Sequence, residues 1–526
     1  MNIVSLFYLA FVALVALAYF VSPRRLRWVV LLGASLVIYL YCGRKMIVWM
    51  LLTSLTIYAG GMLMDRQEQK YLRQMQAQPN LDRNGKRALK KQNERVKRRF
   101  AVLVAAVNIV IWVVFKFSDL FISSLNRSFS TNLSLLNLAL PLGISFYTLQ
   151  AISYVVDISR GKCEVQKNYF KLLLWLCFFP QILQGPICRY RETAHQLYEP
   201  HDFDFFRVKF GMQRMLWGFF KKLVIADRVV TVSNQVFANS ARYEGVIFVI
   251  GALAYTIQIY ADFSGGMDII SGTAEILGVN MPLNFERPYF SRNIAEYWRR
   301  WHITLGTWFR DYVFYPLSIS RAAQTLSKHC RKWFGPNLGK MIPTYLAMVL
   351  VWLLNGIWHG AGAQFVAFGM YQGILIVLGM QFEPVFEWII NKFNIRTDCF
   401  SWRLWQRLRT LALIMGGRII FKANGLPEAA RIAGSIFTTR NWWVLTDGTI
   451  FTLGLDAWEM FVLFVAVLVL LTVSILQEKG IRIRETLEKQ NLLFRWAFTI
   501  AAVVAVVLLG VYGLDLDLSG FVYAGF

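Results

Sequence analysis

The feature that most constrains this sequence is a series of long apolar runs, separated by short segments rich in Lys and Arg. A helix needs about 20 apolar residues to cross the hydrocarbon core of a bilayer, and many of the runs approach that length. Hydrophobic residues make up 56% of the 526 residues and charged residues only 17%, too apolar a balance for a soluble protein of this size. We therefore predict an all-α polytopic membrane protein without a soluble domain. Besides the helix that carries Asn355 and His359, the expected spans are 2–21, 28–42, 46–64, 100–122, 141–158, 245–260, 364–380, 408–421, 457–476 and 492–512.

The basic segments predict how the chain is oriented. Three arginines follow the first apolar run, and residues 65–99 hold twelve Lys or Arg against four Asp or Glu. Loops rich in Lys and Arg stay on the cytoplasmic side, so both termini are expected outside, including a C-terminal tail with Asp515 and Asp517 and no basic residue. Residues 86–99 fit either a helix lying along anionic lipid headgroups or a solvated cytoplasmic loop.

The net charge of +25 does not indicate a nucleic-acid partner. Most of the basic residues stand between apolar spans, where the positive-inside rule and attraction to anionic lipid account for them. We therefore expect membrane lipid, and no nucleic acid, among the partners.

Three segments depart from the simple pattern of crossing helices. Residues 170–183 form a short apolar run followed by Gly and Pro, which favours a re-entrant or interfacial element. Residues 208–226 alternate apolar and basic positions, as an interfacial helix or a crossing helix with basic ends would. Asp262 and Ser264 stand in the sequence ADFSGG at the end of a span. This pattern predicts a broken helix with its backbone exposed to a cavity, where both side chains would bind substrate.

Residues 298–312 read as one amphipathic helix at the membrane surface. His302 falls on the apolar side of this helix, together with Trp298 and Trp301. The row of aromatic residues on the apolar side by itself indicates only an interfacial helix. A histidine turned inward among tryptophans, in contrast, indicates a role in a reaction.

The stretch 351–371 is apolar enough to enter a bilayer, yet it carries Asn355 and His359. Their spacing of four residues places both side chains on one helix face. Ionisable groups at membrane depth are costly and usually functional, although a histidine bonded to a nearby carbonyl is the alternative. Gly356 and Gly360 would let a neighbouring helix or a substrate approach. Because burial disfavours the imidazolium, His359 would act as a neutral base toward a hydroxyl group.

Other chemistries lack support in the sequence. No phosphate-binding loop, HExxH or GxSxG motif is present, and the six cysteines show neither CxxC pairs nor ligand spacing with His, so no metal is expected. Cys188 could carry an acyl group, but a packed small thiol is the simpler interpretation. A neutral histidine deep in an apolar helix, with a second histidine among aromatic residues, suits acyl transfer.

Several motifs, in the same order, also resemble the membrane-bound O-acyltransferase family, closest to its bacterial branch of polysaccharide O-acetyltransferases and teichoic-acid D-alanyltransferases. The motifs are YTIQIYADFSG at 255–265, NFERPY at 284–289, WRRWHITL at 298–305, FRDYVFYPL at 309–317 and NGIWHG at 355–360. Further similar segments are PLGISFYTLQAISYVVDI, FFPQILQGPICRY, IFKANGLPEA and the final FVYAGF. The resemblance covers most of the chain from about Pro141 onward.

This resemblance implies a fold and a reaction. The fold would be a ring of about 10–12 tilted transmembrane helices, with re-entrant and interfacial helices, around a central tunnel in a bacterial plasma membrane. A thioester donor, either acetyl-CoA or an acyl carrier protein, would enter from the cytoplasm. The acceptor would be a hydroxyl of a cell-surface polysaccharide, reached directly or through a secreted or membrane-anchored SGNH-type partner.

The resemblance also implies roles for residues. His359 matches the essential histidine of the family, and His302 matches the second one. We expect the catalytic pair His359 and His302, and substrate-binding side chains at Asn355, Asp262, Ser264, Trp298 and Trp358. Residues 1–526 would form a single membrane domain, with N-terminal helices in 1–135, the catalytic core in 136–380 and C-terminal helices in 381–526. The basic loop 318–340 is longer than expected for alginate enzymes, which leaves the donor open between coenzyme A and an acidic carrier.

Three alternatives remain beside O-acetylation. D-alanyl transfer toward teichoic acid belongs to the same class of reaction. A transporter or flippase would use the irregular spans as a substrate path and His359 as a proton relay. A scaffold without activity is the third, against which the intact histidines argue.

Overall fold

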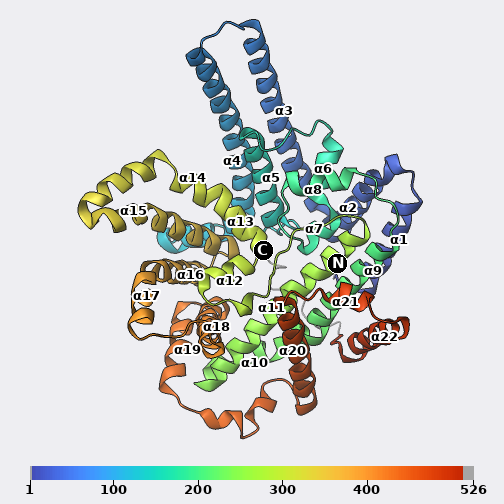
Figure 1. Cartoon of the computed structure of the whole chain (residues 1–526), viewed down its shortest axis with the longest axis vertical. Helices are drawn as coiled ribbons and strands as arrows, with labels where there is room; N and C mark the ends of the chain where they lie inside the picture. The colour runs from blue at the N-terminus through green and yellow to red at the C-terminus, as the bar shows by residue number, and fades with distance from the viewer. Residues whose placement is uncertain (1–2, 513–526) are drawn as a thin grey trace. The chain divides into compact units, whose positions relative to one another are not determined.

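The computed structural model of the chain describes residues 3–512; the predicted outer tail with Asp515 and Asp517 and the FVYAGF segment lie outside the described residues. The described part is helical, with one isolated β-bridge and no strand in residues 3–512. Figure 1 shows the order of the helices. The chain separates into two compact units, of which the first holds residues 3–215 and 270–282 and the second holds 216–269 and 283–512.

The first unit contains the N-terminal helices. Its element α5 is enclosed by neighbours along nearly its whole length, whereas α1 and α4 expose long apolar faces. The helices are α1 (Leu6–Val21), α2 (Arg27–Gly43), α3 (Ile47–Ala77), α4 (Arg83–Phe129), α5 (Ile144–Ser159), α6 (Tyr169–Cys177), α7 (Phe179–Gln184), α8 (Tyr190–Tyr198) and most of α9 (Phe205–Phe219).

The second unit contains the helices that carry both predicted catalytic histidines. They are most of α11 (Val246–Ile276), with α10 (Asp227–Ala238), α12 (Ile294–Arg300), α13 (Ile303–Phe309), α14 (Tyr315–Ser318), α15 (Arg321–His359), α16 (Ala363–Gln381), α17 (Glu383–Lys392), α18 (Phe400–Lys422), α19 (Leu426–Thr438), α20 (Ala457–Glu478), α21 (Ile483–Glu488) and α22 (Leu492–Leu509). Two π-helical segments, Phe220–Ala226 and Arg310–Phe314, lie among them.

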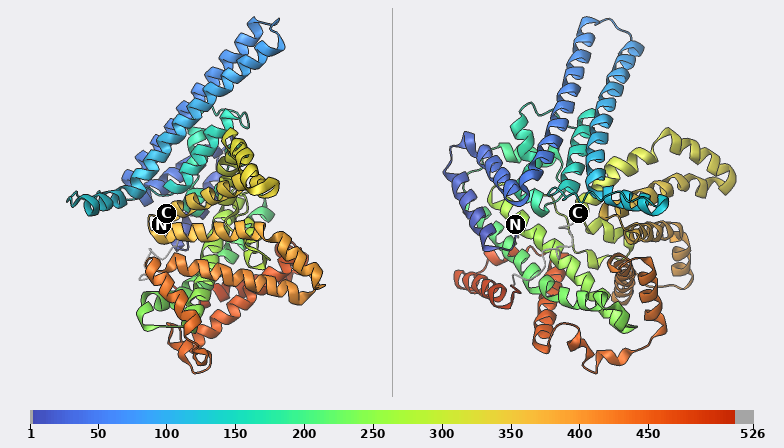
Figure 2. Two further views of the ribbon diagram at one scale, coloured as in Figure 1. Left: turned by 90° about the vertical axis from the view of Figure 1, so that its left-hand side faces the viewer. Right: turned by 180° about the vertical axis from the view of Figure 1, so that it is seen from behind.

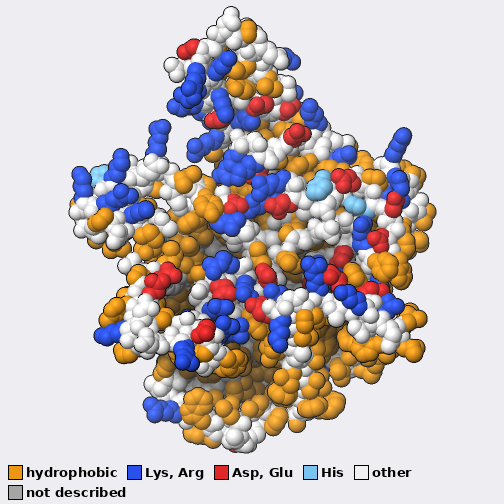
Figure 3. All heavy atoms as spheres, in the orientation of Figure 1, with side chains coloured by type: hydrophobic (Ala, Val, Ile, Leu, Met, Phe, Trp, Pro, Cys, Tyr) orange, Lys and Arg blue, Asp and Glu red, His pale blue; other side chains and the backbone are white. Residues whose placement is uncertain are grey.

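The membrane character predicted from the sequence is confirmed. Seven helical segments in the described residues are long and apolar enough to cross a bilayer, and α1 and the α6–α7 region are shorter apolar segments. Large apolar side chains stay exposed along these helices, for example Phe461 and Phe464 on α20, and Figure 3 shows broad apolar areas on one face. Such surface is costly in water and favourable against lipid tails. The chain is an all-α polytopic membrane protein.

The predicted break at residues 261–266 is wrong, because α11 continues through it as one helix. The glycines serve close packing instead of a break. A Cβ at Gly265 would lie only 2.9 Å from the carbonyl oxygen of Gly218. The polar side chains of this segment are satisfied by a neighbouring helix, so the backbone need not open toward a cavity.

The interfacial helix predicted at 208–226 is also corrected. Its C-terminal part is the π-helical segment Phe220–Ala226, in which Lys221 and Lys222 are 3% and 5% exposed. These lysines do not face headgroups or water. They pair with carboxylates of α10 and α11, which a pattern of residue types within one segment cannot reveal.

Two further predictions about local structure fail. Residues 298–312 form two short helices, α12 and α13, with a break at Trp301 and His302. The segment 321–340 is helical, with a sharp kink at Gly335, whose φ is 79°. A Cβ at Gly339 would lie 2.4 Å from the amide nitrogen of Arg331, so the two arms of the kink pack against each other. The predicted basic loop is therefore a helical hairpin.

The basic segment 65–99 is helical as well. The second half of α3 and the first half of α4 lie side by side as a long hairpin, joined by the turn at residues 78–82 (Figures 1 and 2).

Candidate active site

The backbone around His302 is shaped by a short antiparallel contact with the segment before α12. Phe285 and Trp301 form the isolated bridge, and the amide of Ile303 donates to the carbonyl oxygen of Asn284 at 3.0 Å. This contact ends α12 at Arg300. His302 then adopts a left-handed conformation with φ of 46°, which is uncommon for a residue with a Cβ and tends to mark functional positions. The motifs NFERPY and WRRWHITL thus meet at His302.

The amide side chain of Asn284 holds the His302 ring. Its Oδ1 atom accepts from the Thr304 amide at 3.1 Å and from the Thr304 hydroxyl at 2.9 Å, and His302 Nδ1 lies 3.2 Å away. Because a backbone amide can only donate, Oδ1 is the acceptor in all three contacts. Nδ1 of His302 therefore carries its proton and donates, which leaves the lone pair on Nε2.

The surroundings of His302 keep its ring neutral. The side chain is 3% exposed, and the ring of Phe263 lies 4.9 Å from it in an edge contact. Burial lowers the pKa of His302 to about 3, because it disfavours the charged imidazolium. At neutral pH Nε2 is therefore unprotonated and can accept a hydrogen bond.

His359 is the last residue of α15 and is 5% exposed. Aromatic rings surround it, with Phe421 of α18 at 5.4 Å and Phe368 of α16 at 6.0 Å between ring centroids. Close packing of α15 on α16 positions it. A Cβ at Gly356 would lie 2.5 Å from the carbonyl oxygen of Phe365, and a Cβ at Gly369 would lie 2.3 Å from that of Trp352. These glycines allow α16 to approach α15 closely, which is the role that the sequence predicted for Gly356.

Trp358 is close to both histidines. Its ring centroid is 5.0 Å from that of His359 and 6.0 Å from that of His302. The structure thus brings both predicted catalytic residues to one indole, although 56 residues separate them in the chain. Trp358 itself was predicted to bind substrate, and it is buried in this position.

Asn355 and Trp298 lie on the same side of α15 as His359. Asn355 is one helical turn before His359 and is 7% exposed, and within residues 3–512 its Oδ1 atom accepts no hydrogen bond. Trp298 packs on Trp352 at 4.6 Å and donates from Nε1 to Oε1 of Gln372 at 3.1 Å. Both side chains border the region around His359, so their predicted role in substrate binding remains compatible with their places.

Asp262 and Ser264 lie in a network of buried charges beside this region. Lys222 Nζ is 2.8 Å from Asp262 and 2.6 Å from Asp227, while Lys221 Nζ donates to Ser264 at 3.0 Å. Lys221 also pairs with Asp268 at 2.6 Å. Phe263, between the two predicted residues, is the one that contacts His302. The substrate role of Asp262 and Ser264 stays a prediction, and their visible partners are lysines.

Sequence reasoning gave no role to three buried polar residues near the histidines. Asn284 stands in the motif NFERPY, from which no separate role for it is predicted. Gln372 of α16 is fully buried, and Arg418 of α18 is 3% exposed, donates to the Tyr297 hydroxyl at 2.9 Å and stacks over Trp301 at 4.7 Å. A usable signal was available for Arg418, since a charged residue within an apolar run is rarely without a role.

Cys188 is poorly suited to carry an acyl group. It is fully buried, and burial raises the pKa of its thiol well above the ordinary value, which lowers the fraction of reactive thiolate. Among residues 3–512, no group of three or more His, Cys, Asp or Glu gathers as metal ligands would.

Comparison with known proteins gives a consistent family. Residues 165–328 match the model of MBOAT, the membrane-bound O-acyltransferase family. The chain is 32% identical over 350 residues to a probable alginate O-acetylase of Pseudomonas syringae pv. tomato, covering 66% of this chain and 62% of that protein. It is 28% identical over 368 residues to the peptidoglycan O-acetyltransferase of Helicobacter pylori, covering 65% of each.

A third relative comes from a different envelope chemistry. The teichoic acid D-alanyltransferase of Bacillus subtilis is 28% identical over 252 residues, covering 47% of this chain and 60% of that protein. The matches therefore span somewhat less than two thirds of the length of these relatives. They confirm the predicted resemblance of this chain to the membrane-bound O-acyltransferase family and to its bacterial branch.

Proposed function

We propose that the protein is a membrane-bound O-acyltransferase that moves an acetyl group from a thioester donor to a hydroxyl of a polysaccharide outside the cytoplasm. The observation that carries this proposal is the pair of buried histidines, His302 and His359, whose rings lie 6.0 Å and 5.0 Å from the ring of Trp358. Relatives named for O-acetylation of alginate and of peptidoglycan support the acetyl group and the polysaccharide acceptor.

The proposed chemistry needs one base. His359 takes the proton of the acceptor hydroxyl while the hydroxyl oxygen bonds to the thioester carbonyl carbon. The carbon–sulfur bond then breaks, and the departing thiolate takes the proton from the imidazolium. Asn355, one turn before His359, orients the imidazole or the acyl carbonyl. His302, with its lone pair on Nε2, holds the acceptor hydroxyl as a hydrogen-bond acceptor.

The proposed setting is the plasma membrane of a bacterium. The donor, acetyl-CoA or an acyl carrier protein, would approach from the cytoplasm, where the exposed Arg321, Lys328 and Lys332 of α15 offer charge to its acidic groups. The acceptor polysaccharide would be reached on the other side, directly or through a secreted SGNH-type partner.

Loss of the base should abolish the reaction. We expect His359→Ala in lipid nanodiscs to lower the transfer of radiolabel from acetyl-CoA to envelope polysaccharide by about 100-fold or more, because general-base catalysis contributes roughly 10²–10⁴. The measurement is labelled ester in the polysaccharide fraction. The matched control is His329→Ala, since His329 is an exposed histidine on the same helix.

The outcomes separate the alternatives. Undiminished acetyl transfer in His359→Ala would remove this residue from the mechanism. Transfer from a D-alanyl carrier protein, with acetyl-CoA left intact, would move the function to D-alanylation, which the Bacillus subtilis relative makes the second candidate. If neither donor were consumed in the wild type with envelope extract present, transport or a scaffold role would replace the enzyme.

A further inference from the structure

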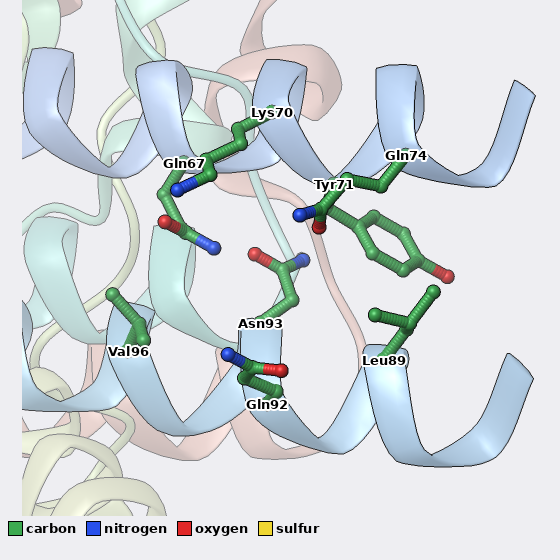
Figure 4. A pocket seen from close by; sticks show the side chains of 8 residues that line it. All are labelled: Gln67, Lys70, Tyr71, Gln74, Leu89, Gln92, Asn93 and Val96. Atoms are coloured by element: carbon green, nitrogen blue, oxygen red, sulfur yellow. The ribbon is translucent and has the colours of Figure 1, made fainter. Parts of the chain in front are cut away.

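The hairpin formed by residues 65–99 of α3 and α4 has a polar seam. Gln67, Tyr71 and Gln74 of α3 face the other helix around a pocket of about 140 Å³, as Figure 4 shows. Across it lie Leu89, Gln92, Asn93 and Val96 of α4. A pair of helices within lipid would place apolar or small residues between them, so amides and a tyrosine in the seam indicate a hairpin that stands in water.

One acidic side chain of the hairpin is used inside it. Glu68 accepts from the Asn93 amide at 2.9 Å and from Lys97 Nζ at 2.8 Å, so its charge is neutralised between the helices. Asp82 caps α4 by accepting from the Gly85 amide at 2.8 Å. Neither carboxylate is therefore placed to balance the outer face of α4 farther along, where exposed Glu94, four residues after Lys90, is the acidic side chain next to the basic residues.

The outer face of α4 has charges of one sign near the hairpin tip. Between residues 83 and 91 there are five basic residues and no acidic one, and all five are exposed. They are Arg83, Lys86, Arg87, Lys90 and Lys91. Their spacings of three and four residues place them side by side, where like charges destabilise a helix by about 0.2–0.5 kcal/mol per pair. An anionic partner would relieve this repulsion.

The tip of the hairpin is too far from the bilayer for lipid to be that partner. α3 and α4 run without interruption from their apolar segments into the hairpin, and α4 becomes apolar only at Phe100. At about 1.5 Å per residue, Arg83, Lys86 and Arg87 stand roughly 20–25 Å beyond that point along the helix, and Lys90 and Lys91 roughly 14–15 Å. The headgroup layer takes up only about 5–8 Å and screening in salt acts within about 8 Å. Arg98 and Arg99, in contrast, lie at headgroup level.

The surface also differs from one that binds nucleic acid. Single-stranded nucleic acid is held by exposed aromatic rings as well as cations, and the only aromatic residue between 65 and 99 is Tyr71, which lines the seam. What remains is a straight stripe of cations along one helix, about 12 Å long from Arg83 to Lys91. Figure 3 shows the basic side chains gathered over this projecting hairpin.

We propose that the outer face of α4 from Arg83 to Lys91 is a docking surface for a soluble protein with an acidic helix. Carboxylates spaced by three or four residues on such a helix would match the spacing of the five cations. The hairpin would hold that partner away from the membrane and raise its concentration near the protein. This inference stands apart from the proposed acyl transfer, since it concerns binding and not the histidine region.

The test uses the full-length protein in nanodiscs of zwitterionic lipid at 150 mM salt. The probe is a synthetic 20-residue helical peptide with Glu at every third or fourth position, and binding is measured by fluorescence anisotropy. The variant Lys86→Glu/Arg87→Glu/Lys90→Glu/Lys91→Glu should bind it at least about 30-fold more weakly, because four exposed pairs of about 0.5 kcal/mol each are lost. Glu has nearly the helix propensity of Lys and Arg and preserves the number of like-charge neighbours, so the hairpin should stay folded.

The matched control is Lys392→Glu/Arg396→Glu/Arg403→Glu/Lys479→Glu, which makes the same charge change on exposed residues outside the hairpin and outside the basic part of α15. It should weaken peptide binding less than threefold. Equal losses in both variants would mean that only net charge matters and would overturn the proposal. The proposal would also be overturned if the α4 variant lost its binding to vesicles with anionic lipid or to a 20-nucleotide RNA while it still bound the peptide.

Discussion

At the scale of single residues, the neighbours of His302 fix which of its ring nitrogens carries the proton. Asn284 accepts from His302 Nδ1 because its own orientation is set by the Thr304 amide and hydroxyl. The resulting lone pair on Nε2 is a property of three side chains from two motifs, and none of the three determines it alone. A pattern of residue types can nominate His302 but cannot assign its tautomer.

Replacing Asn284 should change the protonation of His302 before it changes the fold. In Asn284→Asp, a carboxylate would favour the imidazolium, so the pKa of His302 should rise from about 3 toward or above its ordinary value. As the pH falls, the His302 ring of Asn284→Asp should become protonated at a higher pH than in the wild type. Acyl transfer should therefore also be lost at a higher pH. The ¹⁵N chemical shifts of labelled histidine measure the tautomer directly, and the pH profile of transfer measures its consequence.

The control for this prediction is Thr304→Val, which removes a hydroxyl donor to Asn284 and leaves the bond to His302 in place. Its histidine spectrum should resemble that of the wild type. If Asn284→Asp and Thr304→Val gave the same spectra and the same pH profile, Asn284 would only support the fold.

At the scale of helices, glycines decide how closely the elements of the site approach. α15 and α16 meet through Gly356 and Gly369, and α11 meets the π-helical segment through Gly265. Each glycine removes a Cβ where a carbonyl oxygen of the neighbour would otherwise collide with it. The site is therefore sensitive to added volume on helix faces that bear no reacting group.

A methyl group at Gly356 should separate α15 from α16. Its Cβ would lie 2.5 Å from the carbonyl oxygen of Phe365, so Gly356→Ala should destabilise the protein by about 1–3 kcal/mol. Thermal unfolding followed by tryptophan fluorescence in detergent measures the change. The opposite result is expected for Gly379→Ala on α16, where a Cβ meets nothing within 4 Å and the better helix propensity of Ala should stabilise slightly. Equal midpoints for both variants would contradict the packing argument.

At the scale of the whole molecule, the distribution of basic residues predicts which loops share a side of the membrane. The basic hairpin and the segment after α20, which is rich in both signs and holds four Lys or Arg, should face the cytoplasm, whereas the loop before α20 should face outward. A single cysteine at Ala88 should react with a maleimide only after the membrane is permeabilised. A cysteine at Thr446, which is also exposed, should react in intact cells.

The native cysteines set the background of this labelling experiment, and the unmodified chain is its control. Reaction of both positions from the same side would contradict the predicted orientation.

The sequence by itself determined the class of the fold and singled out His302 and His359 as candidate site residues. Long apolar runs leave helices as the only way to satisfy the backbone in lipid, and His359 stands out because an ionisable group in such a run is costly. Helix positions such as 364–380, found as α16, follow from the same reasoning. These inferences use only composition and local spacing, which the linear chain contains in full.

Only the tertiary structure decided what the polar residues do. The sequence pattern predicts that Asp262 lines a cavity and that Lys222 faces lipid headgroups, whereas in the structure the two side chains form an ion pair. The pattern also predicts one helix over residues 298–312, whereas the bridge between Phe285 and Trp301 interrupts it. The contact of Trp358 with His302 and the stacking of Arg418 over Trp301 join elements that are far apart in the chain. The physical reason is the same in each case. A charge, a break or a tautomer is set by its partner in space, and local spacing does not name that partner.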